Sequence, residues 1–187
     1  MHMTTIATSS QSAASAALRL TADIAQYLTF ALSGETYAFG ILNVKEIIEY
    51  GMLTQVPMTP NFLRGVINLR GSVVPIVDLL ARFGKGVTAI NKRTGIVIVE
   101  TANGDENAGR QDIGIIVDAV NEVVDIASQD IEPPPSFGTG IRPDFISGMV
   151  KSDSRFIILL NIDSVLSIEE MSALSQAGIE KPKNVGN

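Results

Sequence analysis

The chain has 187 residues, no cysteine, no tryptophan and one histidine, and its 14 basic and 20 acidic side chains give a net charge of −6. Without cysteine or a second histidine it cannot form disulfides, a thiolate nucleophile or a cysteine- or histidine-rich zinc site. The acidic balance and the 5% content of aromatic residues also disfavour a general nucleic-acid surface, so no nucleic-acid partner is expected.

The N-terminal segment, residues 1–23, is expected to be a flexible tail. Positions 4–17 consist almost entirely of Ala, Ser, Thr and Gln, which offer too little apolar surface to offset the entropy of ordering. From Gln26 onward, apolar residues alternate in short runs separated by turn residues such as Ser33 and Gly34, a pattern typical of strands joined by tight turns. Strands are predicted at 27–32, 36–40, 66–69, 73–77, 95–99, 113–117, 123–126 and 155–160.

Helices are expected to be few and short. Asp78 is a candidate N-cap for one helical turn, and a second helix is predicted to begin after Ser167 and to end near Gly178, with a charged tail beyond it. Many short strands with few helices favour a sandwich or small barrels over a doubly wound parallel sheet.

An internal repeat divides the chain into two similar halves. The segment from Pro60 to Val66 matches the segment from Pro143 to Met149, and the same offset of 83 residues carries Asp78 onto Asn161. Each half is too small to bury a large core alone, so the two five-strand units are expected to share one hydrophobic core.

The turn that follows Leu69 is the most distinctive local feature. Because side chains alternate along a strand, Asn68 and Arg70 lie on one face, away from Ile67 and Leu69. Gly71 permits the positive φ that a tight hairpin requires, which places Arg70 at the rim of the turn. Two interpretations stay open at this point: a solvated surface arginine, or an arginine that contacts a partner.

Catalytic chemistry is not predicted. The sequence contains no phosphate-binding loop, nucleophile elbow or metal-ligand motif, so no catalytic residue, metal or cofactor is expected. A carboxylate-dependent hydrolase is a remote alternative that requires paired acids, but the candidate acids are spread over separate elements: Asp112, Asp118, Asp125 and Asp130. No apolar run approaches the roughly 18 residues of a membrane helix, so a cytoplasmic protein without direct membrane insertion is expected.

The strings Asn68-Leu69-Arg70-Gly71 and Pro75-Ile76-Val77-Asp78-Leu79, preceded by Pro60 and Phe62, resemble the signature of the CheW-like family of bacterial chemotaxis coupling proteins. The resemblance extends over about residues 24–170. It implies a mainly β fold with two SH3-like five-stranded β-barrel subdomains that share a hydrophobic core. The implied domain is 24–167, with subdomains at about 24–90 and 91–167 between which strand exchange is left open, and a C-terminal helix and tail at 168–187.

The resemblance also implies a function. Family members are non-enzymatic scaffolds that bind the cytoplasmic tips of methyl-accepting chemoreceptors and the regulatory domain of the chemotaxis histidine kinase, and they are recruited to membrane-associated receptor arrays. Coupling in a related pathway, such as twitching motility, is the alternative. The positions that match the family's receptor contacts are Val44, Glu46, Gly65, Arg70, Ile96, Gly114 and Val120. Of these, Gly65 and Gly114 are expected to act by shaping the backbone, and the assignment of Ile96 depends on the alignment of one strand.

Overall fold

The computed structural model describes residues 23–102, 109–136, 138 and 140–177, so most of the predicted N-terminal tail and all of the C-terminal tail lie outside the described residues. The strands are β1 (Ile24–Leu32), β2 (Glu35–Gly40), β3 (Val44–Glu49), β4 (Leu63–Leu69), β5 (Ser72–Asp78), β6 (Gly95–Ala102), β7 (Arg110–Val117), β8 (Ala119–Ala127), β9 (Ile146–Ser152) and β10 (Arg155–Leu160). The α-helices are α2 (Leu79–Arg82), α3 (Ile162–Val165) and α4 (Ile168–Ala177), and the 3-10 turns are η1 (Ile41–Asn43), η2 (Ser128–Asp130) and η3 (Pro143–Phe145).

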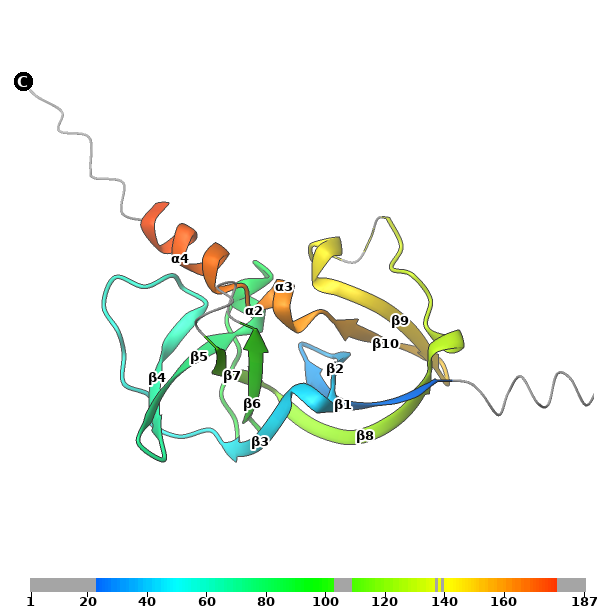
Figure 1. Ribbon diagram of the computed structural model, residues 1–187, viewed down its shortest axis with the longest axis horizontal. Coiled ribbons are helices and arrows are strands. Elements are labelled where there is room, and N and C mark those ends of the chain that lie inside the picture. Colours follow the sequence, from blue (N-terminus) through cyan, green and yellow to red (C-terminus); the bar gives the residue numbers. More distant parts are fainter. Residues whose placement is uncertain (1–22, 103–108, 137, 139, 178–187) are drawn as a thin grey trace, which may run out of the picture.

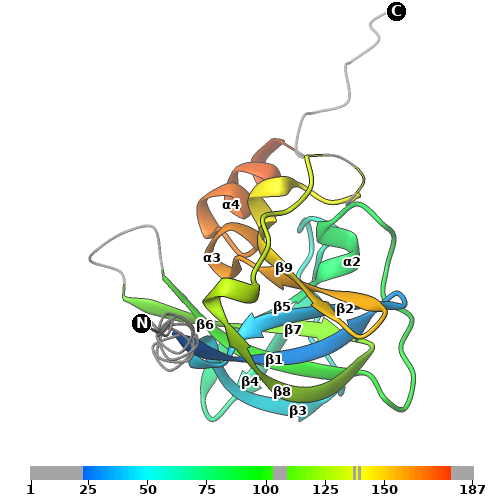
Figure 2. The same ribbon diagram turned by 90° about the vertical axis from the view of Figure 1, so that its right-hand side faces the viewer.

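The strands form two five-stranded sheets, which confirms the mainly β fold. The first sheet has the order β8-β1-β2-β10-β9 and the second has the order β3-β6-β7-β5-β4 (Figures 1 and 2). The sheets do not follow the division near residue 90, because each sheet takes strands from both repeats. The chain passes from one sheet to the other between β2 and β3, and again between β7 and β8. This exchange lets two small units build one core.

Each sheet curls so that its two edges approach each other. After β3, Thr54 pairs with Val66 of β4, and after β8, Glu132 pairs with Met149 of β9, in both cases through two backbone hydrogen bonds of 2.8 or 2.9 Å. These isolated bridges span the gap between edge strands without a continuous ladder, so neither sheet is a fully closed barrel. Each repeat therefore contains one such isolated backbone bridge.

A glycine in each repeat makes this closure possible. A Cβ atom on Gly65 would lie 2.6 Å from the Thr54 carbonyl oxygen, and a Cβ atom on Gly148 would lie 2.3 Å from Ile131 Cγ2. The two glycines are 83 residues apart and occupy equivalent positions in the repeats. They recur in both halves because the bridging segment must lie directly against their backbone.

We therefore expect Gly65→Ala to lower the free energy of unfolding by about 1–3 kcal/mol, since the new methyl group would press on backbone that cannot move independently. The φ of +148° at Gly65 adds backbone strain for any other residue. Urea unfolding measures the loss. Gly51→Ala is the matched control, because nothing lies within 4 Å of a Cβ atom at Gly51. Equal stability of the two variants would contradict this account of the closure.

The hydrophobic core has three parts. The largest cluster draws buried residues from both sheets and includes Phe30, Phe39, Val97 and Ile115. A second cluster, which includes Ala38 and Leu159, belongs to the first sheet, and a third, of Val74, Ile76, Ile96, Ile98 and Ile116, belongs to the second. Both faces of β6 and β7 are therefore buried, one against the shared core and the other inside the curl of the second sheet.

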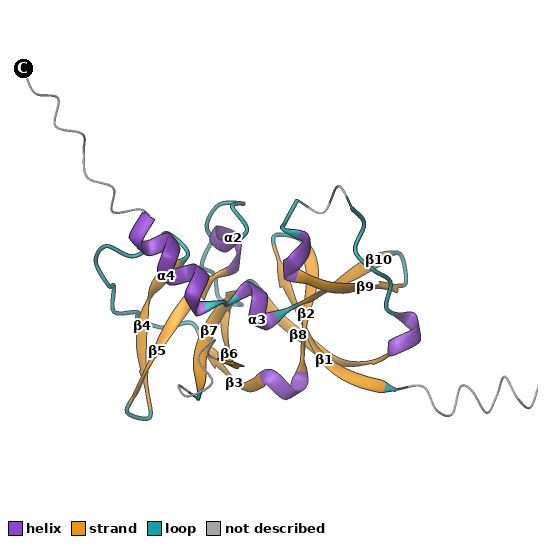
Figure 3. Cartoon of the chain, turned by 45° about the horizontal axis from the view of Figure 1, so that its top comes forward, coloured by secondary structure: helices purple, strands orange, loops and turns teal. Residues whose placement is uncertain are grey.

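The short helices α2 and α3 directly follow the β4–β5 and β9–β10 hairpins, each of which includes an edge strand of its sheet (Figure 3). Asp78 caps α2 by accepting hydrogen bonds from Leu80 N and Ala81 N, and Asn161, its counterpart in the second repeat, caps α3 by accepting from Ser164 N. The cap predicted for Asp78 is thus confirmed. None of the described helices is long and apolar enough to cross a membrane.

Candidate functional site

The β4–β5 hairpin ends in a tight turn that displays Arg70. Arg70 has a φ of +51° and Gly71 a φ of +88°, which is the geometry of a type I′ turn, so the positive φ predicted for Gly71 is confirmed. The Asn68 side-chain oxygen accepts a hydrogen bond of 2.9 Å from Gly71 N and closes the turn. The Arg70 side chain is 77% exposed. Local sequence therefore holds this guanidinium at the tip of the second sheet.

Glu46 on β3 binds the Arg70 guanidinium through two parallel hydrogen bonds. Arg70 Nη1 donates to Glu46 Oε1 at 2.8 Å, and Arg70 Nη2 donates to Glu46 Oε2 at 2.9 Å. β3 and β4 are the two edge strands of the sheet, so this pair joins the edges at the hairpin end, as Thr54 and Val66 do elsewhere. The fork geometry fixes the direction of the guanidinium, and its remaining N–H groups stay available to a partner.

Val44 and Val120 lie at the seam between the two sheets. Val44 begins β3 in the second sheet and Val120 lies on β8 in the first, and both are half-buried against the shared core. Two further apolar side chains follow the same stretch of chain at the surface: Leu42 is 94% exposed and Ile47 is 47% exposed. The seam therefore offers apolar side chains from η1, β3 and β8, and β3 also carries Glu46. The sequence pattern did not single out Leu42 or Ile47.

The other predicted contact residues are inside the protein. Ile96 is 1% exposed and packs in the core of the second sheet. A Cβ atom on Gly114 would lie 2.3 Å from Ile76 Cδ1 and 2.9 Å from Ile96 Cγ2, so Gly114 makes room for the isoleucines around it. Gly65 is buried under the bridging segment. The Ile96 side chain is thus covered by its neighbours in this structure, and a part of Ile96 in receptor binding stays a prediction.

A network of ion pairs lies beside Glu46 and was not recognised from the sequence. Lys45 lies 2.8 Å from Asp112 and 3.2 Å from Glu100, and Arg110 lies 2.8 Å from Glu100. The hydrogen bond to Asp112, and then that to Glu100, raises the pKa of Lys45. Hydrogen bonds from Arg110 and Lys45 lower the pKa of Glu100. The network ties β3 to β6 and β7.

The structure lends no support to the hydrolase alternative. Asp112 binds Lys45, Asp118 accepts a hydrogen bond from Ser33 N, and Asp125 accepts one from Gln26, so these acids serve separate contacts. Within the described part of the chain, no three His, Cys, Asp or Glu side chains are grouped so that they could hold a metal ion. What the site presents is a charged tip beside an apolar seam, an arrangement suited to contact with another protein.

Comparisons with known proteins find a matching family and several relatives of this chain. The family model of the CheW-like domain matches residues 26–170. The chain is 34% identical over 147 residues to the chemotaxis protein CheW of Klebsiella aerogenes, covering 79% of this chain and 84% of that one. It is 32% identical over 136 residues to the protein FrzA of Myxococcus xanthus, covering 72% and 80%. The solved structure of the scaffolding protein TtCheW from Thermoanaerobacter tengcongensis superposes with a TM-score of 0.69 at 37% identity, covering 78% and 90%.

Proposed function

Because the chain belongs to the CheW-like family, a family of non-enzymatic scaffold proteins of chemotaxis, we propose that it couples chemoreceptors to a histidine kinase in a signalling array. The expectation that it is not an enzyme follows from the family. In the proposed role the chain binds the cytoplasmic tips of methyl-accepting chemoreceptors with one surface and the regulatory domain of the kinase with another. Both partners would recruit it to the membrane-associated array.

The observation that carries the receptor side of the proposal is the Arg70–Glu46 pair next to the apolar seam. Protein interfaces commonly combine an apolar centre with a polar rim, and arginine is enriched among the residues that dominate binding energy. Val44 and Val120 would supply the apolar centre, and Arg70 and Glu46 the charged rim. A helical receptor tip with apolar side chains and an acidic group would match this surface.

Gly65, Ile96 and Gly114 have a different part in the proposal. They lie inside the second sheet, where Gly65 admits the bridging segment, and Gly114 admits Ile76 and Ile96. Substitution at these positions would alter receptor binding by displacing β3 and the hairpin that carry the surface residues. We therefore assign these three to positioning and not to contact.

The proposal is tested by reconstitution. The purified chain is mixed with membranes that contain the chemoreceptors of its source cell and with the cognate kinase, and sedimentation and kinase autophosphorylation are measured together. The kinase is expected to sediment with the membranes, and its autophosphorylation to rise, only when the chain is present. Sedimentation of the chain without recruitment of the kinase would contradict a coupling role.

A second candidate is coupling in a related receptor-kinase pathway, such as one that controls twitching motility. The likeness to FrzA favours this second candidate, because FrzA is a relative that does not carry the name CheW. It is similar to this chain over most of both sequences. A pull-down from the source cell, with the captured receptor and kinase identified by mass spectrometry, separates the two pathways. Capture of a chemotaxis kinase supports the first candidate, and capture of another receptor-linked kinase supports the second.

A further inference from the structure

Arg82, at the end of α2, lies where the two repeats meet. Its guanidinium carbon is 5.4 Å from the ring centre of Phe62 and 4.7 Å from that of Phe145, and these two phenylalanines are equivalent positions, 83 residues apart. Arg82 Nε also donates a hydrogen bond of 2.9 Å to the carbonyl oxygen of Val165, which is the equivalent of Arg82 itself. Because matching residues of both repeats surround this one side chain, Arg82 lies close to the axis that relates the repeats.

The positive charge of Arg82 depends on α4 for its neutralisation. The Arg82 side chain is 4% exposed, and within the described part of the chain the one acid in ion-pair contact with it is Glu170 of α4, with 3.3 Å between Arg82 Nη2 and Glu170 Oε1. Nη2 makes no hydrogen bond with any described group. A buried charge without a partner is strongly unfavourable. Arg82 therefore ties the docking of α4 to the junction between the repeats.

Glu170 also holds an arginine from the second repeat. Arg142, which precedes η3, donates a hydrogen bond to Glu170, and its guanidinium carbon lies 4.6 Å from the ring centre of Phe145. One carboxylate of α4 thus contacts an arginine of α2 in the first repeat and an arginine beside η3 in the second. We call Arg82, Arg142 and Glu170 the clasp.

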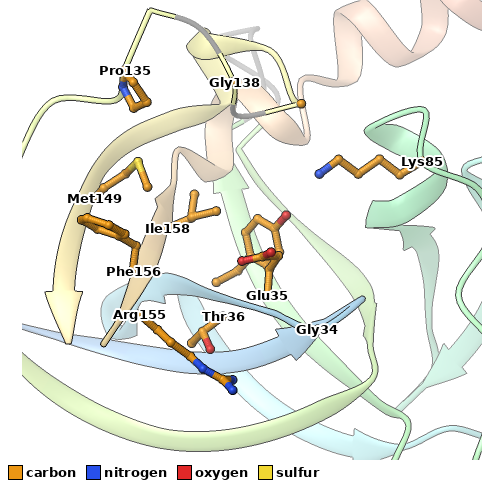
Figure 4. Close-up of a pocket in the computed structure, with 12 residues that line it drawn as sticks. Gly34, Glu35, Thr36, Lys85, Pro135, Gly138, Met149, Arg155, Phe156 and Ile158 are labelled. Carbon is orange, nitrogen blue, oxygen red and sulfur yellow. The ribbon is translucent and has the colours of Figure 1, made fainter. Parts of the chain in front are cut away.

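Packing beside the clasp is incomplete. The ring centre of Phe83 lies 6.0 Å from that of Phe145 and 5.8 Å from that of Tyr37. Next to Tyr37, however, a hollow of 610 Å³ separates Lys85, which follows α2, from Ile158 on β10 of the first sheet (Figure 4). Apolar packing is non-directional, whereas a planar guanidinium fixes the direction of its contacts. The clasp is therefore suited to set the angle at which the two sheets meet.

The clasp and the seam lie on opposite sides of the molecule. The helices α2, α3 and α4 are on one side, and β3 and β8 are on the other (Figures 1 and 2). Val44 on β3 belongs to the second sheet and Val120 on β8 to the first, so the spacing across the seam follows the angle between the sheets. We propose that the clasp sets this angle, and that Arg82 and Glu170 are positioning residues for receptor binding. The receptor part of this assignment rests on the proposed function.

Spin labels measure the spacing directly, because a chain without cysteine takes them only where cysteine is introduced. Glu49→Cys on β3 and Val123→Cys on β8 place one label on each sheet at exposed positions, and double electron resonance gives the distribution of distances between them. Glu170→Gln keeps the size of the side chain but removes its charge, and should widen this distribution. Glu169→Gln is the matched control, because Glu169 is the exposed neighbour and makes no ion pair with a described residue. An unchanged distribution in the Glu170→Gln variant would overturn the proposal.

A double variant separates positioning from stability. Arg82→Met/Glu170→Met replaces the pair by apolar side chains, an exchange that often leaves stability unchanged or raises it, so this variant should resist urea at least as well as Glu170→Gln. Its distance distribution should stay wide, because methionine supplies no directional contact. A narrow distribution at recovered stability would mean that Arg82 acts through stability alone, and would also overturn the proposal.

Receptor co-sedimentation tests the functional part, with chains that carry no labels. Glu170→Gln should bind receptor membranes at least about fivefold more weakly, the lower end of couplings between separate sites, and Glu169→Gln should bind like the unmodified chain. A widened distance distribution with unchanged receptor affinity would overturn the assignment of Arg82 and Glu170 to positioning. If the unmodified chain itself does not bind receptors, the proposed function fails, and the distance distributions still decide whether the clasp sets the angle between the sheets.

Discussion

Replacing Arg70 by glutamate is expected to abolish binding of the chain to chemoreceptor tips while leaving the chain folded. Arg70 is 77% exposed at a hairpin tip, and loss of an exposed ion pair costs about 0–1 kcal/mol of stability. At an interface, by contrast, an arginine that anchors binding contributes about 2 kcal/mol or more, which is some thirtyfold or more in affinity. Reversal of its charge beside Glu46 would add repulsion toward an acidic receptor group.

Receptor co-sedimentation and receptor-dependent kinase autophosphorylation measure this effect, with circular dichroism as the check on folding. Arg93→Glu is the matched control, because Arg93 is exposed and its side chain makes no ion pair among the described residues. It introduces the same change of charge at a position away from the hairpin tip. Normal kinase activation by a folded Arg70→Glu variant would remove Arg70 from the proposed interface.

A charge swap separates two ways in which Arg70 could act. The double variant Glu46→Arg/Arg70→Glu restores a pair between β3 and the hairpin but displays the opposite charge at the tip. If Arg70 matters only because it holds the hairpin against β3, the swap should recover receptor binding. We expect no recovery, because the proposal gives Arg70 a direct contact with the receptor.

The sequence predicted the parts of this surface that depend on neighbours along the chain. The Asn68-Leu69-Arg70-Gly71 string was enough to predict a tight hairpin with Arg70 at its rim, because Gly71 adopts the required positive φ. The partner of Arg70 could not be predicted in this way. Glu46 is on a strand at the opposite edge of the sheet and meets Arg70 only because the sheet curls.

The same distinction explains why the burial of the Ile96 side chain could not be predicted. The run Ile96-Val97-Ile98-Val99 is apolar at every position, so alternation gives no sign of which face is covered. In the structure both faces are covered: Val97 and Val99 face the shared core, and Ile96 and Ile98 face the interior of the second sheet. Nor could the repeat predict which strands share a sheet, since β1 pairs with β8, about a hundred residues away in the chain.

Asp78→Ala is expected to lower the free energy of unfolding by about 3–5 kcal/mol, more than Gly65→Ala or Arg70→Glu, because it removes one partner from a buried polar network. The Asp78 carboxylate is fully buried. It accepts hydrogen bonds from Leu80 N, Ala81 N and both the backbone N–H and the hydroxyl of Thr88, and it forms an ion pair of 3.1 Å with Arg64. Alanine would leave these donors without an acceptor.

The internal repeat supplies the control for this prediction. Asn161 occupies the position equivalent to Asp78 and caps α3, but it is exposed and its side chain accepts one hydrogen bond, from Ser164 N. Asn161→Ala should therefore cost about 1 kcal/mol, the usual value of a helix cap. Urea unfolding of the two variants measures the difference. Equal losses would mean that only the cap matters. A much larger loss at Asp78 would show that the first repeat depends on this carboxylate to fix the base of the hairpin that carries Arg70, because Asp78 ends β5 and Arg64 lies on β4.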